Sequence, residues 1–477
     1  MLASPDLSGY TILYAKNPGG GAALSAQTKN DFSQGSLVGN ILRLAGPMTL
    51  ALLVNTLYSI VDRIYIGHIP DGKLALTGIG LAAPILMVIS AFQALCSSGG
   101  APLFSIARGE KNEERAQRIQ GNAYCLLLIL GLSLTLLAYV FKGPVLRWTG
   151  ASPETFPYAD AYLSIYLAGT VFVMTGVGMN PYINAQGFGQ VGMLTVLIGA
   201  LLNLVLDPLF IYAFHWGVQG AAAASVLSQM VSSLWVLRFL TGKRALLPLR
   251  TRFLRLDPEI VKKMLSLGIA GFTMAFTNSA VSFAYNSTLS RLGGDTHVAV
   301  MTILNSLREL SFMPASGVTE AAKPVLGYNY GAREWERCKA CIRVMVLMVA
   351  SYCLVVWAAF MLAPGFFVRI FNSDPELLEL GIYGIRHYYA MIFFMTFMMA
   401  GQNTFTGLGL AKRAVFFSLL RKFIILLPLI YLMPAITGLG ANGVFWAEPV
   451  SQFLGAGACF TTMYFTVYRK LGKAEKL

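Results

Sequence analysis

The chain has 477 residues, of which 56% are hydrophobic and only 12% are charged, whereas soluble domains carry about 25% charged residues. This composition and the mean hydropathy of +0.62 exclude a soluble globular enzyme as the default class. The net charge of +14 is compatible with nucleic-acid binding, but the basic residues concentrate between apolar segments, as in a membrane protein. We therefore expect no nucleic-acid partner and a chain that lies in membrane lipid.

Apolar segments recur along the whole chain, each near the length of about 20 residues that crosses a bilayer as a helix. Segments such as 126–141 and 344–361 are apolar on every side, unlike the alternating strands of a membrane barrel. The sequence predicts an all-α integral membrane protein with twelve transmembrane helices. The predicted helices cover residues 41–66, 76–105, 119–141, 158–180, 191–213, 218–240, 262–290, 297–325, 341–362, 383–408, 413–435 and 442–468.

The chain divides into four parts by composition. Residues 1–35 are polar and rich in Gly and Ser, which predicts a disordered cytoplasmic tail. Residues 36–240 form an amino lobe of six helices, and a basic linker at 241–261 joins it to a carboxyl lobe at 262–477, which ends in a short cytoplasmic tail. No cleavable signal peptide is evident, because the first residues lack an apolar core.

The basic residues indicate the orientation of the chain. Lys and Arg concentrate on one side of the predicted spans, in the segments 108–118, 238–263, 333–343, 412–422 and 469–476. The segment 412–422 contributes Arg421 and Lys422 to this count. Cytoplasmic loops carry such an excess, so we expect a multi-pass protein of the cell inner (plasma) membrane with both termini in the cytoplasm.

The two halves of the chain repeat each other at a shift of about 220 residues. Gly217-Val-Gln-Gly220 is matched by Gly440-Ala-Asn-Gly443, and the pair Ser228-Gln229 that follows it is matched by Ser451-Gln452. Each half has an even number of spans, so both halves enter the membrane from the same side. The sequence thus predicts two pseudo-symmetric six-helix bundles related by an axis along the membrane normal.

Charged residues inside predicted spans are expensive to insert and mark functional sites. Counting 1.5 Å per residue places Asp62, Asp207 and Ser225 at one depth, and Asn203 lies one helical turn before Asp207. Their oxygens suit Na⁺, or a proton shared between two acids. The structural alternative is that Asp62 caps its helix or pairs with Arg63, while Asp207 begins a loop.

The carboxyl lobe has a different set of charges. Arg308 and Glu309 are predicted at mid-depth, and Glu448 aligns with Ser225 of the first half. Functional and structural interpretations of these residues are equally open. For Glu320 and Lys323, near the end of a predicted span, we favour the structural interpretation, because long side chains there extend to the membrane surface.

Sulfur and aromatic side chains are candidates for the lining of a path between the lobes. Such side chains bind varied organic cations through packing and cation–π attraction, although core packing alone produces the same pattern. The candidates are Met174, Met179, Tyr182, Phe283, Tyr285, Met313, Phe394, Met395 and Met398.

The cysteines do not predict a metal centre or a disulfide framework. The six residues are scattered, and Cys338-x-x-Cys341 stands without a second pair or a nearby histidine. We expect no cofactor and no structural metal. The chain is therefore not expected to be an enzyme.

The motifs together resemble the multidrug and toxic compound extrusion (MATE) transporters, and most closely their MepA-like branch. The resemblance extends from Phe32 to Leu471. It depends on Gly46-Pro47, on Asn55-x-x-Tyr58-x-x-x-Asp62, on Asn203-Leu-Val-Leu-Asp207-Pro208 and on the segment Tyr328-Asn-Tyr-Gly-Ala332.

The resemblance implies a secondary transporter that exports cationic or amphipathic organic compounds in exchange for Na⁺ or H⁺. The cation site of the family maps onto Asp62, Asn203 and Asp207, with Ser225 where Thr is common. The choice between Na⁺ and H⁺ stays open, and we expect a monomer. Glu320 and Lys323 depart from the family, where an amide is more typical.

Two other functions stay open from sequence. A flippase for lipid-linked oligosaccharides would have similar architecture but needs more cationic groups along its cavity, where Arg308 is the one deep candidate. A membrane-embedded phosphotransferase needs several acids around Mg²⁺ or a His/Cys set. The four histidines are dispersed along the chain, at His68, His215, His297 and His387.

Overall fold

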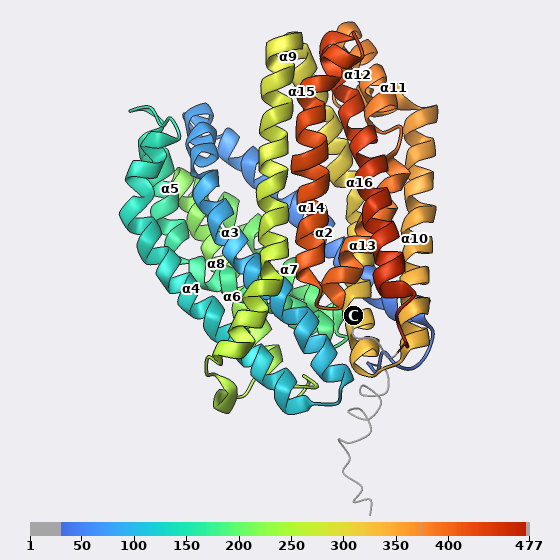
Figure 1. The fold of residues 1–477 in the computed structure, drawn as a ribbon. Coiled ribbons are helices and arrows are strands. Elements are labelled where there is room, and N and C mark those ends of the chain that lie inside the picture. The colour runs from blue at the N-terminus through green and yellow to red at the C-terminus, as the bar shows by residue number, and fades with distance from the viewer. Residues whose placement is uncertain (1–29, 373, 474–477) are drawn as a thin grey trace, which may run out of the picture.

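The computed structural model describes residues 30–372 and 374–473, and within these ranges the chain is helical and contains no strand. Figure 1 shows two groups of helices side by side, the blue-to-green amino lobe with α3 to α8 and the yellow-to-red carboxyl lobe with α9 to α16. The prediction of an all-helical membrane fold is confirmed.

Side chains cap the first turns of two of the three long helices that begin the amino lobe. Ser36 accepts a hydrogen bond from the backbone of Gly39 at 3.4 Å, and Asn112 accepts one from Arg115 at 3.0 Å, which satisfies donors that a helix start leaves free. The elements are α2 (Leu37–Gly67), α3 (Gly72–Gly109), α4 (Glu113–Trp148), α5 (Phe156–Ala168), α6 (Thr170–Ala185), α7 (Gly189–Pro208), η1 (Leu209–Ala213) and α8 (Gly217–Thr241).

One predicted span of the amino lobe is a bent pair of helices. Helices α5 and α6 meet at 58° around Gly169. A Cβ atom at Gly169 would lie 2.6 Å from the side chain of Val226 on α8, so the close packing of this bend against α8 needs a residue without a side chain. The span therefore continues to Ala185, five residues beyond its predicted end.

The carboxyl lobe contains a larger share of broken helices. Its elements are η2 (Thr251–Phe253) in the linker, then α9 (Pro258–Gly331), α10 (Trp335–Leu362), α11 (Pro364–Arg369), α12 (Pro375–Tyr388), η3 (Ile392–Phe394), α13 (Met395–Gly407), α14 (Ala411–Leu419), η4 (Leu420–Leu426), α15 (Leu427–Ile436), η5 (Gly440–Trp446), α16 (Ala447–Met463) and η6 (Tyr464–Tyr468). The 74-residue α9 is two helices joined at Gly294, whose φ of 69° and ψ of −163° are not helical.

The twelve predicted spans are accounted for by these elements. Eight described helices are long and apolar enough to span a bilayer, and the bent α5–α6 pair makes nine. At 1.5 Å per residue, α9 would be over ~100 Å long, so its two arms are separate spans. The remaining two spans are the broken segments α12–η3–α13 and η5–α16–η6.

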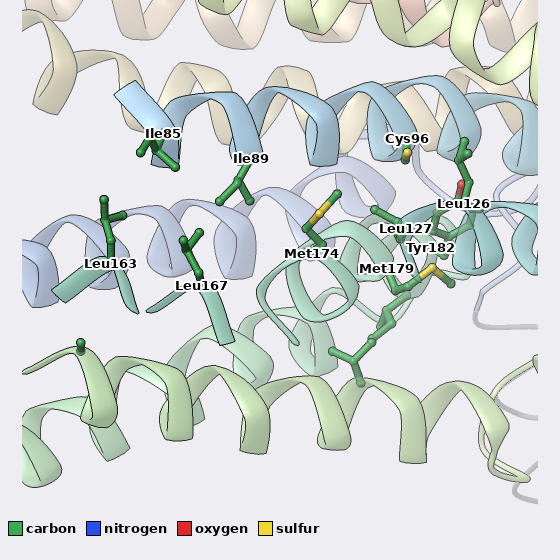
Figure 2. Packing of buried hydrophobic residues seen from close by; sticks show 14 of the residues in the cluster. Ile85, Ile89, Cys96, Leu126, Leu127, Leu163, Leu167, Met174, Met179 and Tyr182 are labelled. Atoms are coloured by element: carbon green, nitrogen blue, oxygen red, sulfur yellow. The ribbon is translucent and has the colours of Figure 1, made fainter. Parts of the chain in front are cut away.

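Each lobe has its own apolar core. Figure 2 shows the core of the amino lobe, where Met174, Met179 and Tyr182 point among the side chains of Leu126 and Leu127. All three are completely buried. They pack the interior of the lobe, in contrast to the path lining that the sequence predicted for them.

The lobes contact each other toward the end of the molecule that carries both described chain ends, here called the terminal end. Gly472 lies against Trp335 there, and Arg337 reaches the segment before α2. Along this seam, a Cβ atom at Gly99 would overlap the carbonyl oxygen of Met264 in the other lobe. The backbones of α3 and α9 are therefore in direct contact.

Residues 30–35 form a packed segment, here called the strap, although the sequence assigned them to a disordered tail. The ring of Phe32 is 2% exposed and meets Tyr328 edge to face at 5.7 Å. The guanidinium of Arg108 lies 5.3 Å from the Phe32 ring and donates a 2.5 Å hydrogen bond to the carbonyl oxygen of Asn30. The rest of the predicted tail, residues 1–29, lies outside the described residues.

A local turn shapes the strap. Partial burial disfavours the charged form of Asp31, but hydrogen bonds from Ser33 outweigh this effect and hold the pKa of the Asp31 carboxyl below its usual value. The backbone N–H and the hydroxyl of Ser33 donate to Asp31 Oδ1 at 2.9 and 2.6 Å. This turn presents Phe32 to the core of the carboxyl lobe.

Candidate functional site

The polar centre of the amino lobe lies on α7 and α8. Asn203 and Asp207 are one turn apart on α7 and buried, and Asn203 Nδ2 donates to Asp207 Oδ1 at 3.0 Å. The same amide nitrogen lies 3.4 Å from the Ser225 hydroxyl on α8. Pro208 follows Asp207 and the next turn is the π-helix η1, as expected where proline removes a backbone donor.

Asp62 on α2 completes this centre. Its carboxyl lies beside that of Asp207, close enough for the two groups to interact. One oxygen of each acid, Asp62 Oδ1 and Asp207 Oδ2, is buried without a hydrogen-bond donor among the described residues. Buried polar atoms normally have partners, so these two oxygens are available to a cation or a proton.

The acids border a cavity of about 500 Å³, here called the acid cavity. Asp62, Asn203 and Ser225 line it, and Asp207 lies directly behind Asn203. The structure thus places the four predicted cation-site residues together, while their role in ion binding stays a prediction. Sequence reasoning missed three tyrosines in the wall, Tyr58, Tyr162 and Tyr166, although Tyr58 is one turn from Asp62.

A second cavity of about 460 Å³, here called the central cavity, lies next to the first. Tyr58, Gly199 and Gln229 line both cavities. The amino lobe contributes amides and hydroxyls to its lining, together with Met48 and Met193. These polar residues are Asn55, Gln93, Ser97, Ser98, Ser105, Asn180, Asn184, Thr195 and Ser232.

The carboxyl lobe contributes one wall of the central cavity. Glu320, Lys323 and Pro324 of α9 line it, and Glu320 and Lys323 form an ion pair of 2.5 Å. The sequence favoured a structural role for this pair at the membrane surface. The structure instead places the pair at a cavity between the lobes.

The sulfur and aromatic residues predicted to line a path line neither of these two cavities. Met174, Met179, Tyr182, Tyr285, Met313 and Met398 are buried in the cores, and Met395 and Phe394 pack against one. Phe283 is 74% exposed on the outside of α9. These two cavities therefore do not support a lining role for this set, which stays a prediction, because helical spacing of large side chains is what core packing also requires.

The carboxyl lobe has a buried cluster of charges around Glu448. Arg421 on η4 forms an ion pair with Glu448 at 3.0 Å, and Gln452 and Tyr285 donate to the same carboxylate at 3.0 and 3.4 Å. Arg308 donates to the hydroxyl of Tyr388 at 3.3 Å. Of the three predicted residues, Arg308 and Glu448 belong to this cluster.

Glu309, the third predicted residue of this set, is exposed and outside the cluster. Arg308 and Glu309 are neighbours in sequence, and successive side chains on a helix point about 100° apart. This geometry explains why only one of the two reaches the interior of the lobe.

Arg421 and Lys422 were counted as cytoplasmic loop residues in the sequence, and the structure corrects this. Both lie inside the span formed by α14, η4 and α15, and only 5% and 7% of their surfaces are exposed. Lys422 Nζ donates to Asn278 Oδ1 at 2.6 Å and to the carbonyl oxygen of Met274 at 3.3 Å. The sequence signal for their position inside the membrane is that Arg421 comes ten residues after the start of α14.

The cysteines are free thiols in the structure. Cys338 and Cys341 are buried in the core of the carboxyl lobe, and each thiol lies 4.0 Å from a helix carbonyl oxygen. Among the described residues, no group of three or more His, Cys, Asp or Glu side chains is placed to hold a metal ion.

Comparisons with known proteins connect this geometry to one family. The model of the MatE family matches the chain twice, at residues 47–209 and 270–432, once in each lobe. The predicted repeat is therefore confirmed, with a shift of 223 residues between the starts of the two matches. The Multidrug export protein MepA of Staphylococcus haemolyticus is 24% identical over 431 residues, which cover 89% of this chain and 93% of that protein.

Solved structures share the fold over nearly the whole chain. One shows the outward-facing conformation of a multidrug resistance MATE family transporter of the MOP superfamily, with a TM-score of 0.86, 26% identity and coverage of 93% and 98% of the two chains. Another is a MOP superfamily transporter from Pyrococcus furiosus with a TM-score of 0.85, 27% identity and the same coverage. A reversed polarity of its binding pocket is described as suggesting a different function for that protein.

Proposed function

This chain belongs to the MatE family of transporters, and from this membership we propose that it is a secondary active multidrug exporter that exchanges organic compounds for Na⁺ or H⁺. Its relatives are multidrug export proteins rather than enzymes. The proposed substrates are cationic or amphipathic compounds, and the proposed cycle is alternating access between the two lobes. The proposed working unit is a monomer.

The acid cavity supports the coupling of export to an ion. Asp62 and Asp207 come from different helices and each leaves one buried oxygen without a donor among the described residues. The Asn203 amide nitrogen donates to Asp207 and to the hydroxyl of Ser225, so the Ser225 oxygen lies at the same place. Such a set of oxygens binds Na⁺, or holds a proton between the acids.

The shared wall of the two cavities supports exchange. Tyr58 and Gln229 face both the acid cavity and the central cavity. A ligand shifts a conformational equilibrium only through different affinities for its two states. An ion bound on one side of these residues and an organic compound bound on the other therefore act on the same side chains. Binding of one then disfavours binding of the other.

The orientation follows from the basic residues. Arg108, Arg115 and Arg337 lie at the terminal end, and an excess of Arg and Lys belongs to the cytoplasmic side. We place the terminal end in the cytoplasm of a cell whose plasma membrane the protein spans. The ion then enters from the far end of the molecule, and the compound leaves there.

The experiment that tests this function measures export by the purified chain in proteoliposomes under a separately imposed Na⁺ or pH gradient. Asp207→Asn is expected to abolish gradient-driven export of a cationic dye while leaving the amount of folded protein unchanged. Asp295→Asn, which changes an exposed acid beside the break in α9, is the matched control. Full export by the Asp207→Asn variant would overturn the role of the acid cavity.

A further inference from the structure

We propose that the carboxyl lobe contains a binding site for the carboxylate of an amphoteric substrate, formed by Lys422, Arg421 and Asn278. The inference rests on the proposed function, because it names a class of exported compound. That class combines a cationic or aromatic part with a free carboxylate. The acid cavity of the amino lobe serves the cation, and this second site has the opposite charge.

The first argument is an excess of buried positive charge. The charged groups that interact with the Lys422 ammonium are Arg421, Arg308 and Glu448. Glu448 is the one carboxylate in this group, and it is already paired with Arg421 at 3.0 Å. Buried charges need partners of opposite sign. The cluster therefore carries more positive than negative formal charge. A bound anion is the natural partner for the excess.

The second argument is hydrogen bonding. An ammonium group has three donors, and Lys422 uses two of them, on Asn278 and on the carbonyl oxygen of Met274. The Nε atom of Arg421 is buried and has no acceptor among the described residues. Buried donors of this kind are costly unless an acceptor is present, and carboxylate oxygens are acceptors for such donors.

The third argument is access from the space between the lobes. Gly271 on α9 faces the amino lobe, because a Cβ atom there would lie 2.8 Å from the hydroxyl of Ser98 on α3. Asn278 follows seven residues later, about two turns along the same side of the helix. Its side chain is exposed, so the partner of Lys422 lies on the face of α9 that meets the amino lobe at the seam.

The fourth argument comes from the repeat. At the shift of 223 residues, Asn278 is the counterpart of Asn55, which lines the central cavity. A Cβ atom at Gly199 would lie 3.6 Å from Ser232, whereas Arg421 packs against Gly455, the counterpart of Ser232. At the same shift, the counterpart of Gly199, a residue of both cavity walls, is Lys422. The basic cluster is the carboxyl-lobe equivalent of a substrate-lining region.

Binding to the purified full-length protein tests the inference without an ion gradient. The probes are a rhodamine dye with a free carboxylate and the methyl ester of the same dye, and fluorescence anisotropy gives both dissociation constants. The wild-type protein is expected to bind the carboxylate dye more tightly than the ester. Lys422→Gln should reduce this preference about ten- to a hundredfold, the size of a lost charge-assisted hydrogen bond.

Two further variants complete the test. Lys422→Arg keeps the positive charge and should restore most of the preference, which separates anion binding from a defect in folding. Lys412→Gln, at an exposed lysine of α14, should leave the preference as in the wild type. An equal loss of affinity for both dyes in Lys422→Gln, or an unchanged preference for the carboxylate dye, would overturn the proposed site.

Transport separates this inference from the proposed function. If the wild-type protein exports neither dye under any gradient, the exporter hypothesis fails, while the ratio of dissociation constants still decides whether the carboxylate site exists. If it exports both dyes, Lys422→Gln should lower export of the carboxylate dye relative to its ester by a similar factor.

Discussion

Arg337 of α10 holds the carbonyl oxygen of Phe32 in a 3.1 Å hydrogen bond, so a helix of the carboxyl lobe anchors the segment that precedes the first helix of the amino lobe. The same guanidinium group also donates to the carbonyl oxygens of Gln34 and Gly35. Arg108 of the amino lobe holds the strap from the other side, through Asn30. The strap therefore connects the two lobes at the terminal end.

Loosening the strap should favour separation of the lobes at the terminal end. Arg337→Ala removes hydrogen bonds from a charged donor, each worth about 1.5–3 kcal/mol, so a shift of about tenfold or more in the balance between the two states is expected. A maleimide added from the cytoplasmic side should label a cysteine placed at Asn184, in the central cavity, faster than in the parent protein.

The control for this measurement is Arg343→Ala, which removes an exposed arginine further along α10. It is expected to leave the labelling rate unchanged. Equal labelling rates in Arg337→Ala and the parent protein would show that the strap does not restrain the lobes.

A methyl group at the seam should also separate the lobes. Gly99→Ala places a Cβ atom against the backbone of Met264, which cannot move aside as a side chain can. Spin labels on either side of the terminal end should report a longer distance than in the wild type, and export should fall. Gly80→Ala on the same helix is the control, because a Cβ atom there meets nothing within 4 Å. Identical distances in the two variants would contradict this prediction.

Ser225 should contribute an oxygen to the ion site. Ser225→Ala removes the hydroxyl that lies 3.4 Å from Asn203, and is expected to raise the ion concentration for half-maximal export about two- to tenfold, for a loss of about 0.5–1.5 kcal/mol. Ser225→Thr keeps the hydroxyl and should behave like the wild type. An unchanged ion dependence in Ser225→Ala would exclude this hydroxyl from the site.

Met174 should affect stability rather than the choice of substrate. It is completely buried, and truncation of a buried Met to Ala costs about 2–5 kcal/mol. Thermal unfolding of Met174→Ala in detergent should therefore begin at lower temperature, with the range of exported compounds unchanged. Met87→Ala, at a side chain that is 60% exposed, should unfold like the parent. A narrowed substrate range with normal stability would restore the cavity role first predicted for this residue.

The sequence predicts the fold well because one physical requirement dominates it. A bilayer demands long apolar helices with charge at their ends, and the twelve predicted segments follow from that demand. The acid cavity was also foreseeable, since Asp62 and Asp207 stand out in apolar surroundings and helical rise fixes their depth.

The remaining features depend on tertiary packing. Arg421 and Lys422 follow basic residues of a loop, and the loop pattern concealed their burial against Glu448 and Asn278. The spacing of Met174 and Tyr182 along the chain fits residues that line a cavity and residues that pack in a core. Only the arrangement of neighbouring helices decides between these two roles. The strap lies beyond any span, so hydropathy carries no information about it.

The position of the seam has a mechanical consequence. Gly99 and Gly268 bring the two lobes into backbone contact near one end of α9, and Phe283 lies fifteen residues further along the same helix, about 22 Å away. A rotation of only about 10° at this pivot would carry Phe283 through ~4 Å. The seam thus acts as a pivot. A displacement smaller than one methyl group at the seam becomes a movement at Phe283 that is wide enough to admit or release a flat aromatic molecule.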